Sequence, residues 1–533
     1  MDNTGPLLID TGRGFSVLYN NRHLYSPTDP LKRAVLRSNQ IELQNETLYI
    51  VSSPLLFYGV KELLERLPAS SHIICFESSK SLYNLSIEHI PEILLVSKLC
   101  SFISSTKAQD IFSTIENIGI WNFRRVKALT LNGGYSLNSS VYNNIFNKID
   151  MNIQEYWKNR MTLIHMGPLW IKNIFLNLYK IEKDKKISTI FAHPKTECPV
   201  LVTGAGESLE NSINFIKEKR DFFKILAVDT SVSVLLENRI EPDFIIAVDA
   251  QIYNFYDFLE VKNKEIPLFF DITGYSGIPN VLNGLLFPFI SNFANTRLLK
   301  RLEQYNLLPE KVPALGSVGL TAIYHALKIT SNNVFYTGLD FAYKIGKSHA
   351  NGSPRNLSEL IVSTRLNPME QPDIYYSRPL IFSKDKKNTN CITDLILSSY
   401  AELMVENFGD TDRLFDIGTY GLNSGGKLTE PDDLSLHKKC KGAKYPEPKK
   451  GIGSFIEFRK NELKMLSDLY NSVYKYLVGE SENSRGLLEL LKEADYVFLH
   501  FPDKSPEPTL DPVFLKRILV SCGYYINILN KYA

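Results

Sequence analysis

The chain has 533 residues, of which 44% are hydrophobic and 22% charged, and this length exceeds what one hydrophobic core usually serves, so two or three domains are expected. No run of about 18 apolar residues is present to span a bilayer, and the N-terminus lacks the basic and apolar segments of a secretory signal. Sixty basic and 58 acidic residues give a net charge of +2, which offers no electrostatic reason to expect nucleic acid as a partner.

The six cysteines are scattered along the chain without CxxC spacing. They therefore predict neither a disulfide framework nor a zinc site, and a reducing cytoplasm is the expected compartment.

Residues 1–180 alternate short apolar runs with helical stretches, as in TLYIVSSPL, FYGVKELLERL and SHIICFESS. This alternation predicts strand, helix and strand in a parallel sheet, that is, a Rossmann-like α/β domain. The turn after the first strand reads Ser52-Ser53-Pro54 and not the glycine-rich turn of a dinucleotide pocket. A structural or acceptor-binding role is expected for this domain.

Residues 181–428 repeat the alternation, and five strand-like runs end in a turn residue or an acid. In parallel sheets the carboxyl ends of strands share one edge, where ligands bind, so these side chains are expected to converge. Each aspartate can equally be a helix cap or a turn former. The five strand-end residues are Gly204, Asp229, Asp249, Asp271 and Asp340.

Residues 429–533 begin with a basic, proline-containing stretch, HKKCKGAKYPEPKK. Its favoured interpretation is a solvated linker, with a membrane surface or an acidic partner as the alternative. Apolar residues at three- and four-residue spacing follow and predict a helical C-terminal domain.

The segment PVLVTGAGESLE predicts a strand, a turn and a helix. Gly204 and Gly206 permit a tight turn and close approach, and the helix start near Ser208 offers amide groups to a phosphate. A simple tight turn capped by Ser208 is the alternative.

A second segment, PALGSVGLTAIYHALK, opens a helix at Gly316 and Ser317, whose first turn again offers amides and a hydroxyl to an anion. His325 lies further along this helix among apolar residues, and we expect it to be a core residue.

A third segment, VFYTGLDFAYKIGKSHANGSP, places Asp340 at a strand end and His349 in a polar loop. There the imidazole is expected to stay accessible, to titrate near neutrality and to accept a proton from a hydroxyl. A surface histidine is the alternative. The later stretch DIYYSRPLIFSKDKKNTN is either a lid over the site or a surface insertion.

The order of GAGxSL, AVDTSVSVLLENRIEPDFIIAVDAQ, LGSVGLTAIYHAL, YTGLDFAYKIGKSHANGS and LFDIGTYGLNSGG closely resembles the motility-associated factor (Maf) family of flagellin glycosyltransferases. The resemblance is strong over residues 198–428 and looser before them. It implies a central domain similar to bacterial sialyltransferases. It also implies transfer of a nonulosonic acid, such as pseudaminic or legionaminic acid, from its CMP-activated form to Ser or Thr of flagellin in the cytoplasm, a step required for flagellum assembly and motility.

By this resemblance the catalytic residues are His349, as base, and Asp340. One residue departs from the family pattern, because Glu207 stands where proline is usual, and a carboxylate beside an anionic donor is unfavourable unless it points away. The residues that the resemblance assigns to the nucleotide-sugar are Gly204, Gly206, Ser208, Asp229, Thr230, Asp249, Gln251, Gly316 and Ser317.

The implied reaction is a single displacement that expels CMP and inverts the anomeric carbon. One leaving phosphate can be held by amides and hydroxyls, so no metal or other cofactor is required. Asp249 and Asp340 can hold a divalent ion if the donor is misassigned. Two alternatives remain. One is an enzyme like 6-hydroxymethyl-dihydropterin pyrophosphokinase, whose fold the central domain also resembles, and the other is a non-catalytic flagellin-binding protein.

Overall fold

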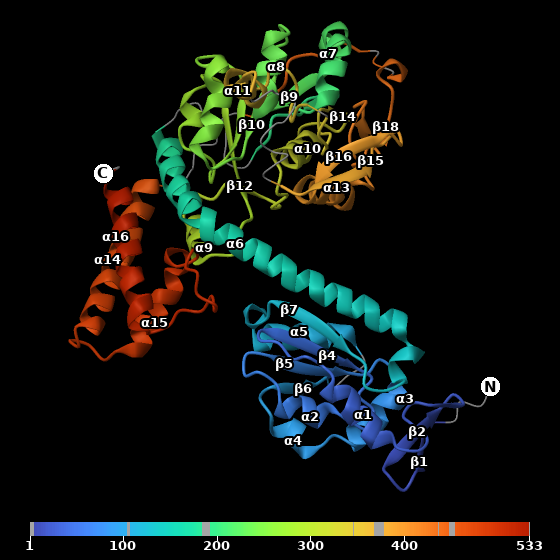
Figure 1. Cartoon of the computed structure of the whole chain (residues 1–533). Helices are drawn as coiled ribbons and strands as arrows, with labels where there is room; N and C mark the ends of the chain where they lie inside the picture. The colour runs from blue at the N-terminus through green and yellow to red at the C-terminus, as the bar shows by residue number, and fades with distance from the viewer. Residues whose placement is uncertain are drawn as a thin grey trace. The chain divides into compact units, whose positions relative to one another are not determined.

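The computed structural model describes residues 5–103, 107–183, 192–344, 346–366, 378–434, 436, 438–446 and 454–531. It forms two compact units, Met1–His165 with Leu499–Pro508, and Met166–Phe498 with Thr509–Ala533. The division falls within one helix, α6 (Ser139–Lys183), which Figure 1 draws in cyan-green. The units thus separate after His165 and not near residue 180, and the C-terminal helices belong largely to the unit of the central region.

The first unit is built on a parallel sheet in the order β6-β5-β4-β7, with a small antiparallel sheet β1-β2-β3 beside its N-terminus. The runs TLYIVS and HIICF become strands β4 and β5, and every residue in them is buried, as expected for a sheet covered on both faces. The elements of this unit are β1 Leu7–Asp10, β2 Phe15–Tyr19, β3 Arg22–His23, α1 Pro30–Asn39, β4 Thr47–Ser52, α2 Val60–Glu65, β5 His72–Phe76, α3 Lys80–Glu88, α4 Glu92–Val96, β6 Cys100–Phe102, α5 Ala108–Ile118, η1 Ile120–Asn122, β7 Arg125–Leu129 and η2 Gly134–Leu137.

The second unit contains a nine-stranded sheet in the order β13-β12-β11-β10-β9-β8-β14-β17-β18. All of its strand pairs are parallel, so all carboxyl ends lie along one edge. These strands are β8 Val200–Thr203, β9 Lys224–Val228, β10 Phe244–Ala247, β11 Leu268–Asp271, β12 Leu286–Ser291, β13 Glu310–Val312, β14 Val334–Thr337, β17 Leu414–Asp416 and β18 Lys427–Leu428.

Helices and a hairpin complete the second unit. Alternate strand residues, such as Val200 and Val202, pack against the buried face of α10, because successive side chains of a strand point to opposite faces. The further elements are α7 Glu207–Glu218, η3 Arg220–Phe222, η4 Asp229–Ser231, α8 Val232–Glu237, η5 Ile252–Val261, η6 Ile278–Asn280, α9 Arg297–Gln304, α10 Val318–Ile329, α11 Pro354–Val362, the antiparallel hairpin β15 Leu380–Lys384 with β16 Asn390–Asp394, α13 Leu395–Phe408, η7 Pro431–Asp433, α14 Phe455–Leu477, α15 Ser484–Glu493, η8 Asp495–Val497 and α16 Pro512–Asn530.

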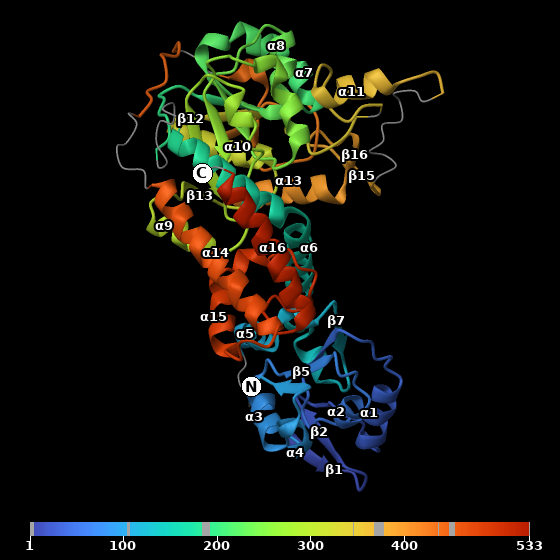
Figure 2. The same cartoon turned by 90° about the vertical axis from the view of Figure 1, so that its left-hand side faces the viewer.

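The predicted α/β class, with a Rossmann-like first domain, a Rossmann-like central domain and C-terminal helices, is confirmed. Helices α14 and α16 lie side by side in both views (Figures 1 and 2). A buried ion pair joins α14 to α9, because Arg301 donates Nε and Nη2 to the two carboxylate oxygens of Glu462 over 3.0 and 2.8 Å. The Glu462 side chain is only 2% exposed.

Two further expectations concern cysteines and membranes. Cys198 and Cys440 lie together, with Cα atoms 5.5 Å apart, so the fold brings one cysteine pair within reach of a disulfide that the spacing did not predict. The two residues are 242 positions apart, and spacing along the chain does not report such proximity. Within the described part of the chain, no helix has the length and apolar character needed to cross a bilayer.

Candidate functional site

The sheet of the second unit reverses its strand order between β8 and β14. From β8 the chain builds outward through β9 to β13, and then returns to place β14 on the other side of β8. Ligands bind at such a switch point, outside the carboxyl ends of the strands. Gly204 and Gly338 directly follow the two strands, so these turns form the centre of the candidate site.

Gly204 and Gly338 let the two turns touch through their backbones. A Cβ added to Gly204 would lie 2.4 Å from the carbonyl oxygen of Gly338. Gly338 has φ +71°, and a Cβ there would lie 2.2 Å from the carbonyl oxygen of Gly204. The close approach of the two turns therefore explains why position 204 is a glycine. The predicted contact of this glycine with a donor stays a prediction.

Asp340 lies against the start of helix α7. Its Oδ2 accepts a hydrogen bond from the Ser208 amide over 2.8 Å, and a Cβ on Gly206 would lie 2.5 Å from that same oxygen. The Ser208 hydroxyl is also engaged, since it donates to the Tyr420 carbonyl and accepts from the Tyr420 amide. Sequence reasoning expected these Ser208 groups to be free for a phosphate, but the protein itself uses them.

The Asp340 carboxylate is buried, and its Oδ1 has no hydrogen-bond partner. Burial raises the pKa of Asp340 to about 6, while the charge of Lys386 and the Ser208 hydrogen bond act in the opposite direction. Lys386 forms a buried ion pair with Asp416 at the end of β17, with 2.6 Å between Nζ and Oδ2. The site thus contains a buried lysine and a second buried carboxylate.

His349 lies in a loop that is attached to the glycine turn, because the neighbouring Ala350 amide donates to the Ala205 carbonyl over 2.7 Å. The imidazole is partly buried, and burial lowers the pKa of His349, against the influence of Glu359. The histidine is thus less exposed, and its pKa lower, than the sequence led us to expect. The physical reason is that the loop packs onto the turn.

The Ser348 hydroxyl orients the His349 ring through a hydrogen bond. Ser348 donates its only hydroxyl proton to Glu359 over 3.0 Å, so its oxygen can only accept from His349 Nδ1, which lies 3.0 Å away. This pattern leaves the lone pair on Nε2. A neutral imidazole with a free Nε2 is the form that can accept a proton.

Glu207 is neutralised by two lysines of the segment before His349. Its carboxylate pairs with Lys344 and with Lys347, the latter over 2.6 Å. Burial opposes ionisation, but the hydrogen bonds and charges of the two lysines outweigh it and hold the pKa of Glu207 below its usual range. A carboxylate at this position is therefore compatible with a neighbouring anion.

The first turn of α10 reaches the same turns through Leu339. A Cβ added to Gly319 would lie 2.6 Å from the Leu339 side chain, which also lies within 2.5 Å of such an atom on Gly204. Ser317 caps α10 by accepting from the Gly319 amide over 3.2 Å, and Gly316 has φ +71°. The two predicted helix starts are thus brought together.

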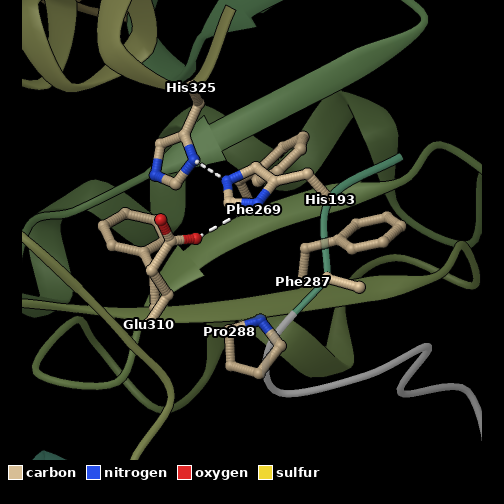
Figure 3. Close-up of a pocket in the computed structure, with 8 residues that line it drawn as sticks. His193, Phe269, Phe287, Pro288, Glu310 and His325 are labelled. Carbon is tan, nitrogen blue, oxygen red and sulfur yellow. Dashed lines mark hydrogen bonds and ion pairs between the residues drawn. The ribbon is translucent and has the colours of Figure 1, made fainter. Parts of the chain in front are cut away.

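His325 is a core residue, as expected, and is 1% exposed. It lines a small cavity of about 10 Å³ (Figure 3), whose other lining residues in the described part of the chain include Phe269 of β11, Phe287 of β12 and Glu310 of β13 and none from β8 or β14. Its Nδ1 lies 3.0 Å from His193 Nε2, and His193 Nδ1 lies 3.1 Å from Glu310. The cavity has room for about one water molecule and not for a nucleotide.

The remaining predicted residues gather at the ends of β9 and β10. Asn254 donates to Asp229 over 2.7 Å and to Asp257 over 3.1 Å. Burial raises the pKa of Asp229 to about 6, and burial together with the Asp229 charge raises the pKa of Asp257 to about 7. The negative charge of Asp249 also acts to raise the pKa of both carboxyl groups.

Three other predicted strand-end groups are involved in local hydrogen bonds. The Thr230 amide donates to Asp229, and the Gln251 amide donates to Asp249. Asp271 accepts from Thr273 and from the Ser291 amide, so for Asp271 the turn-forming interpretation holds. No group of three or more His, Cys, Asp or Glu in the described residues is arranged to hold a metal ion.

Sequence reasoning missed Lys386, Asp416, Asn254 and Asp257. Asp416 ends a strand in the segment LFDIG, so the strand-end pattern could have found it. Lys386 lies in the turn of the β15–β16 hairpin and carries no sequence signal. Of the stretch interpreted as a lid or an insertion, Tyr375 and Tyr376 lie outside the described residues, and residues 378–390 contain β15 and the hairpin turn that carries Lys386.

Comparisons with known proteins agree with this fold. Residues 172–346 match a family described as "6-hydroxymethylpterin diphosphokinase MptE-like". An uncharacterised protein of Treponema pallidum is 25% identical over 557 residues, covering 99% of this chain and 95% of its own. A second uncharacterised protein of that organism is 37% identical over 89 residues, covering 16% of this chain and 40% of its own.

Among solved structures, the Maf glycosyltransferase of Magnetospirillum magneticum AMB-1 is similar, with a TM-score of 0.59 and 13% sequence identity. The match covers 99% of this chain and 89% of that one. The resemblance seen in the sequence is thereby confirmed for the fold, which is that of a Maf glycosyltransferase along almost the whole chain.

Proposed function

We propose that the chain is a glycosyltransferase that moves a nonulosonic acid from a CMP-activated donor to Ser or Thr of flagellin in the cytoplasm. The observation that carries the proposal is the switch point of a Maf-type fold, where Asp340 packs against the glycine turn and the loop of His349 is attached to that turn through the Ala350 amide. The glycine turn follows β8, whereas Asp340 and His349 belong to the segment after β14.

The chemistry assigned to His349 is removal of the acceptor proton. The acceptor oxygen forms a bond to the anomeric carbon, the bond from that carbon to the phosphate oxygen breaks, and CMP departs with the bonding electrons. The hydroxyl proton passes to Nε2 of His349, the nitrogen that the Ser348 hydrogen bond leaves unprotonated. One displacement inverts the anomeric carbon.

The donor is assigned to the carboxyl edge between β8 and β10 and the start of α10. The buried Asp340 Oδ1 has no hydrogen-bond partner within the protein, and we assign it to a donor hydroxyl. Lys344 and Lys347 balance the charges of Glu207 and of Glu210, with which Lys347 also pairs, so the turn can face an anion. The remaining predicted contacts, from Thr230 and Gln251 to Ser317, border the same edge.

A second candidate is a diphosphokinase that acts on a pterin. The family match over residues 172–346 favours it.

Thermal unfolding with CMP, CDP, ATP or AMP, with and without magnesium, separates the two candidates. CMP without metal should raise the midpoint by a few degrees, since a ligand of the native state at about 100 times its Kd adds about 2.7 kcal/mol. Asp340→Ala should abolish the response. Asp412→Ala, at a side chain that is 99% exposed, should retain it.

The opposite pattern would decide for the other enzyme. A response to ATP or AMP that requires magnesium, with none to CMP, contradicts the glycosyltransferase proposal and supports the diphosphokinase. If CMP does bind, the next experiment is transfer from CMP-nonulosonic acids to flagellin, followed by the mass of the intact flagellin.

A further inference from the structure

We infer that Lys386 is a positioning residue of the candidate site: its buried ammonium group, paired with Asp416, keeps the Asp340 carboxylate ionised and able to accept a hydrogen bond. The inference concerns the state of Asp340, and it rests on the proposed function only for its effect on catalysis. It deepens that function by assigning a role to a hairpin that the mechanism has not used.

The first observation is the geometry around Gly418. A Cβ added there would lie 2.9 Å from Lys386 Nζ, 3.0 Å from Asp416 Oδ1 and 3.1 Å from Ser208 Oγ. The ammonium group therefore lies next to the start of α7, whose Ser208 amide holds Asp340. The Lys386 and Asp416 side chains are 5% and 4% exposed, so little solvent screens the three charges from each other.

The second observation is that the backbone holds the hairpin turn in this place. The Lys386 amide donates to the Gly421 carbonyl over 2.9 Å, and the next residue, Leu422, donates to the Asp340 carbonyl over 2.8 Å. A Cβ on Gly421 would lie 2.2 Å from that Asp340 oxygen. The turn, the segment after β17 and the end of β14 are therefore packed backbone to backbone.

The third observation is the balance of charge. Two buried carboxylates, Asp340 and Asp416, face one ammonium group, and the Oδ1 atom of Asp340 has no partner. Without the lysine, two neighbouring buried carboxylates cannot both stay ionised at neutral pH. With it, Asp416 is paired and Asp340 can keep its charge for a ligand.

Other ionisable groups near the cluster are already engaged. Glu207, on α7, is paired with Lys344 and Lys347. Asp385, in the hairpin turn, accepts from Thr389 and from the Lys387 amide, and Lys387 pairs with Glu430 on the surface. Tyr336, on β14, bonds with Ser424 and with Asp416. Lys386 is therefore the cation among the described residues whose loss should act on Asp340.

The test measures Asp340 without any ligand. Burial raises the pKa of Asp340 to about 6, above its unfolded value, so the native state binds the proton more tightly and stability falls as pH rises towards 6. The thermal midpoint of the chain minus that of Asp340→Asn should therefore fall from pH 4 to 6 and then level off. In the Lys386→Met background, the pH at which this difference levels off should be higher by at least about one unit.

Three further variants control the result. Lys386→Arg retains the charge, so the midpoint difference should level off at the original pH, which we call the plateau pH. Lys387→Met, at the exposed neighbouring lysine, should leave the plateau pH unchanged. If Lys386→Met does not fold, Lys386→Met with Asp416→Asn removes the unpaired carboxylate, and the plateau pH should still move upward because Lys386 acts on Asp340 more strongly than Asp416 does.

The inference is overturned if the midpoint difference levels off at the same pH in the Lys386→Met and Lys387→Met backgrounds. Its catalytic consequence is a matching upward move in the acid limb of the pH profile for transfer. A shifted plateau pH with no response to any CMP compound would uphold the role of Lys386 while contradicting the proposed function, so the two failures are distinguishable.

Discussion

His349→Gln should lower kcat for transfer to flagellin by a factor of about 10² to 10⁴, the usual contribution of a positioned general base. Glutamine fills similar space but cannot take up a proton at neutral pH. The response of the thermal midpoint to CMP should persist, because the variant removes proton transfer and leaves the donor contacts in place. The measurement is the initial rate of transfer at saturating donor, beside the CMP titration.

The pH dependence provides an independent check of the same base. Burial lowers the pKa of His349, so the imidazole stays neutral to below about pH 6.5, and the first loss of rate on acidification should come from protonation of Asp340, whose pKa is raised by burial to about 6. His165→Gln, at an exposed histidine, is the matched control. A His349→Gln enzyme with the wild-type rate would exclude this residue as the base.

Arg301→Met should reduce the free energy of unfolding of the second unit by about 3–5 kcal/mol, because it leaves the buried Glu462 carboxylate without its partner. In the native chain Arg301 makes two hydrogen bonds to that carboxylate and one to the Glu493 carbonyl. The measurement is urea unfolding followed by circular dichroism, with the midpoint compared at equal slope.

The double variant Arg301→Met with Glu462→Met serves as the control. It removes both charges, so most of the loss should be recovered, since apolar groups of similar volume replace a buried ion pair with little cost. Arg485→Met, whose pair with Glu489 is exposed, should change stability by less than about 1 kcal/mol. A loss equally small for Arg301→Met would contradict the assigned role of this pair.

The strand ends show which parts of the site can be predicted from sequence. The runs before Gly204, Asp229 and Asp340 are short, apolar and followed by a turn residue, and each becomes a buried strand. Asp271 has the same pattern, yet its oxygens accept bonds from Thr273 and Ser291. Local pattern places an aspartate at the edge of the sheet, but which donors reach it depends on the neighbouring loops.

The histidine and the lysine show what local pattern cannot contain. The type of residue and its polar loop singled out His349, but its burial comes from packing of that loop against Ala205. Lys386 acts on groups at the ends of β14 and β17, at distances along the chain that no spacing rule connects. Its position follows from the way the β15–β16 hairpin folds back onto the sheet.

By itself, the sequence therefore determined the alternation of strands and helices, the glycine turns, the two helix starts and the order of segments that resembles the Maf family, because these depend on short-range periodicity and turn chemistry. Only the tertiary structure decided the switch point between β8 and β14, the engagement of Ser208 by Asp340 and the buried charges of Lys386 and Asp416. The reason is physical: strand order, burial and pairing of charge arise from contacts between residues far apart in the chain, and the energy of each buried group depends on which partners those contacts supply.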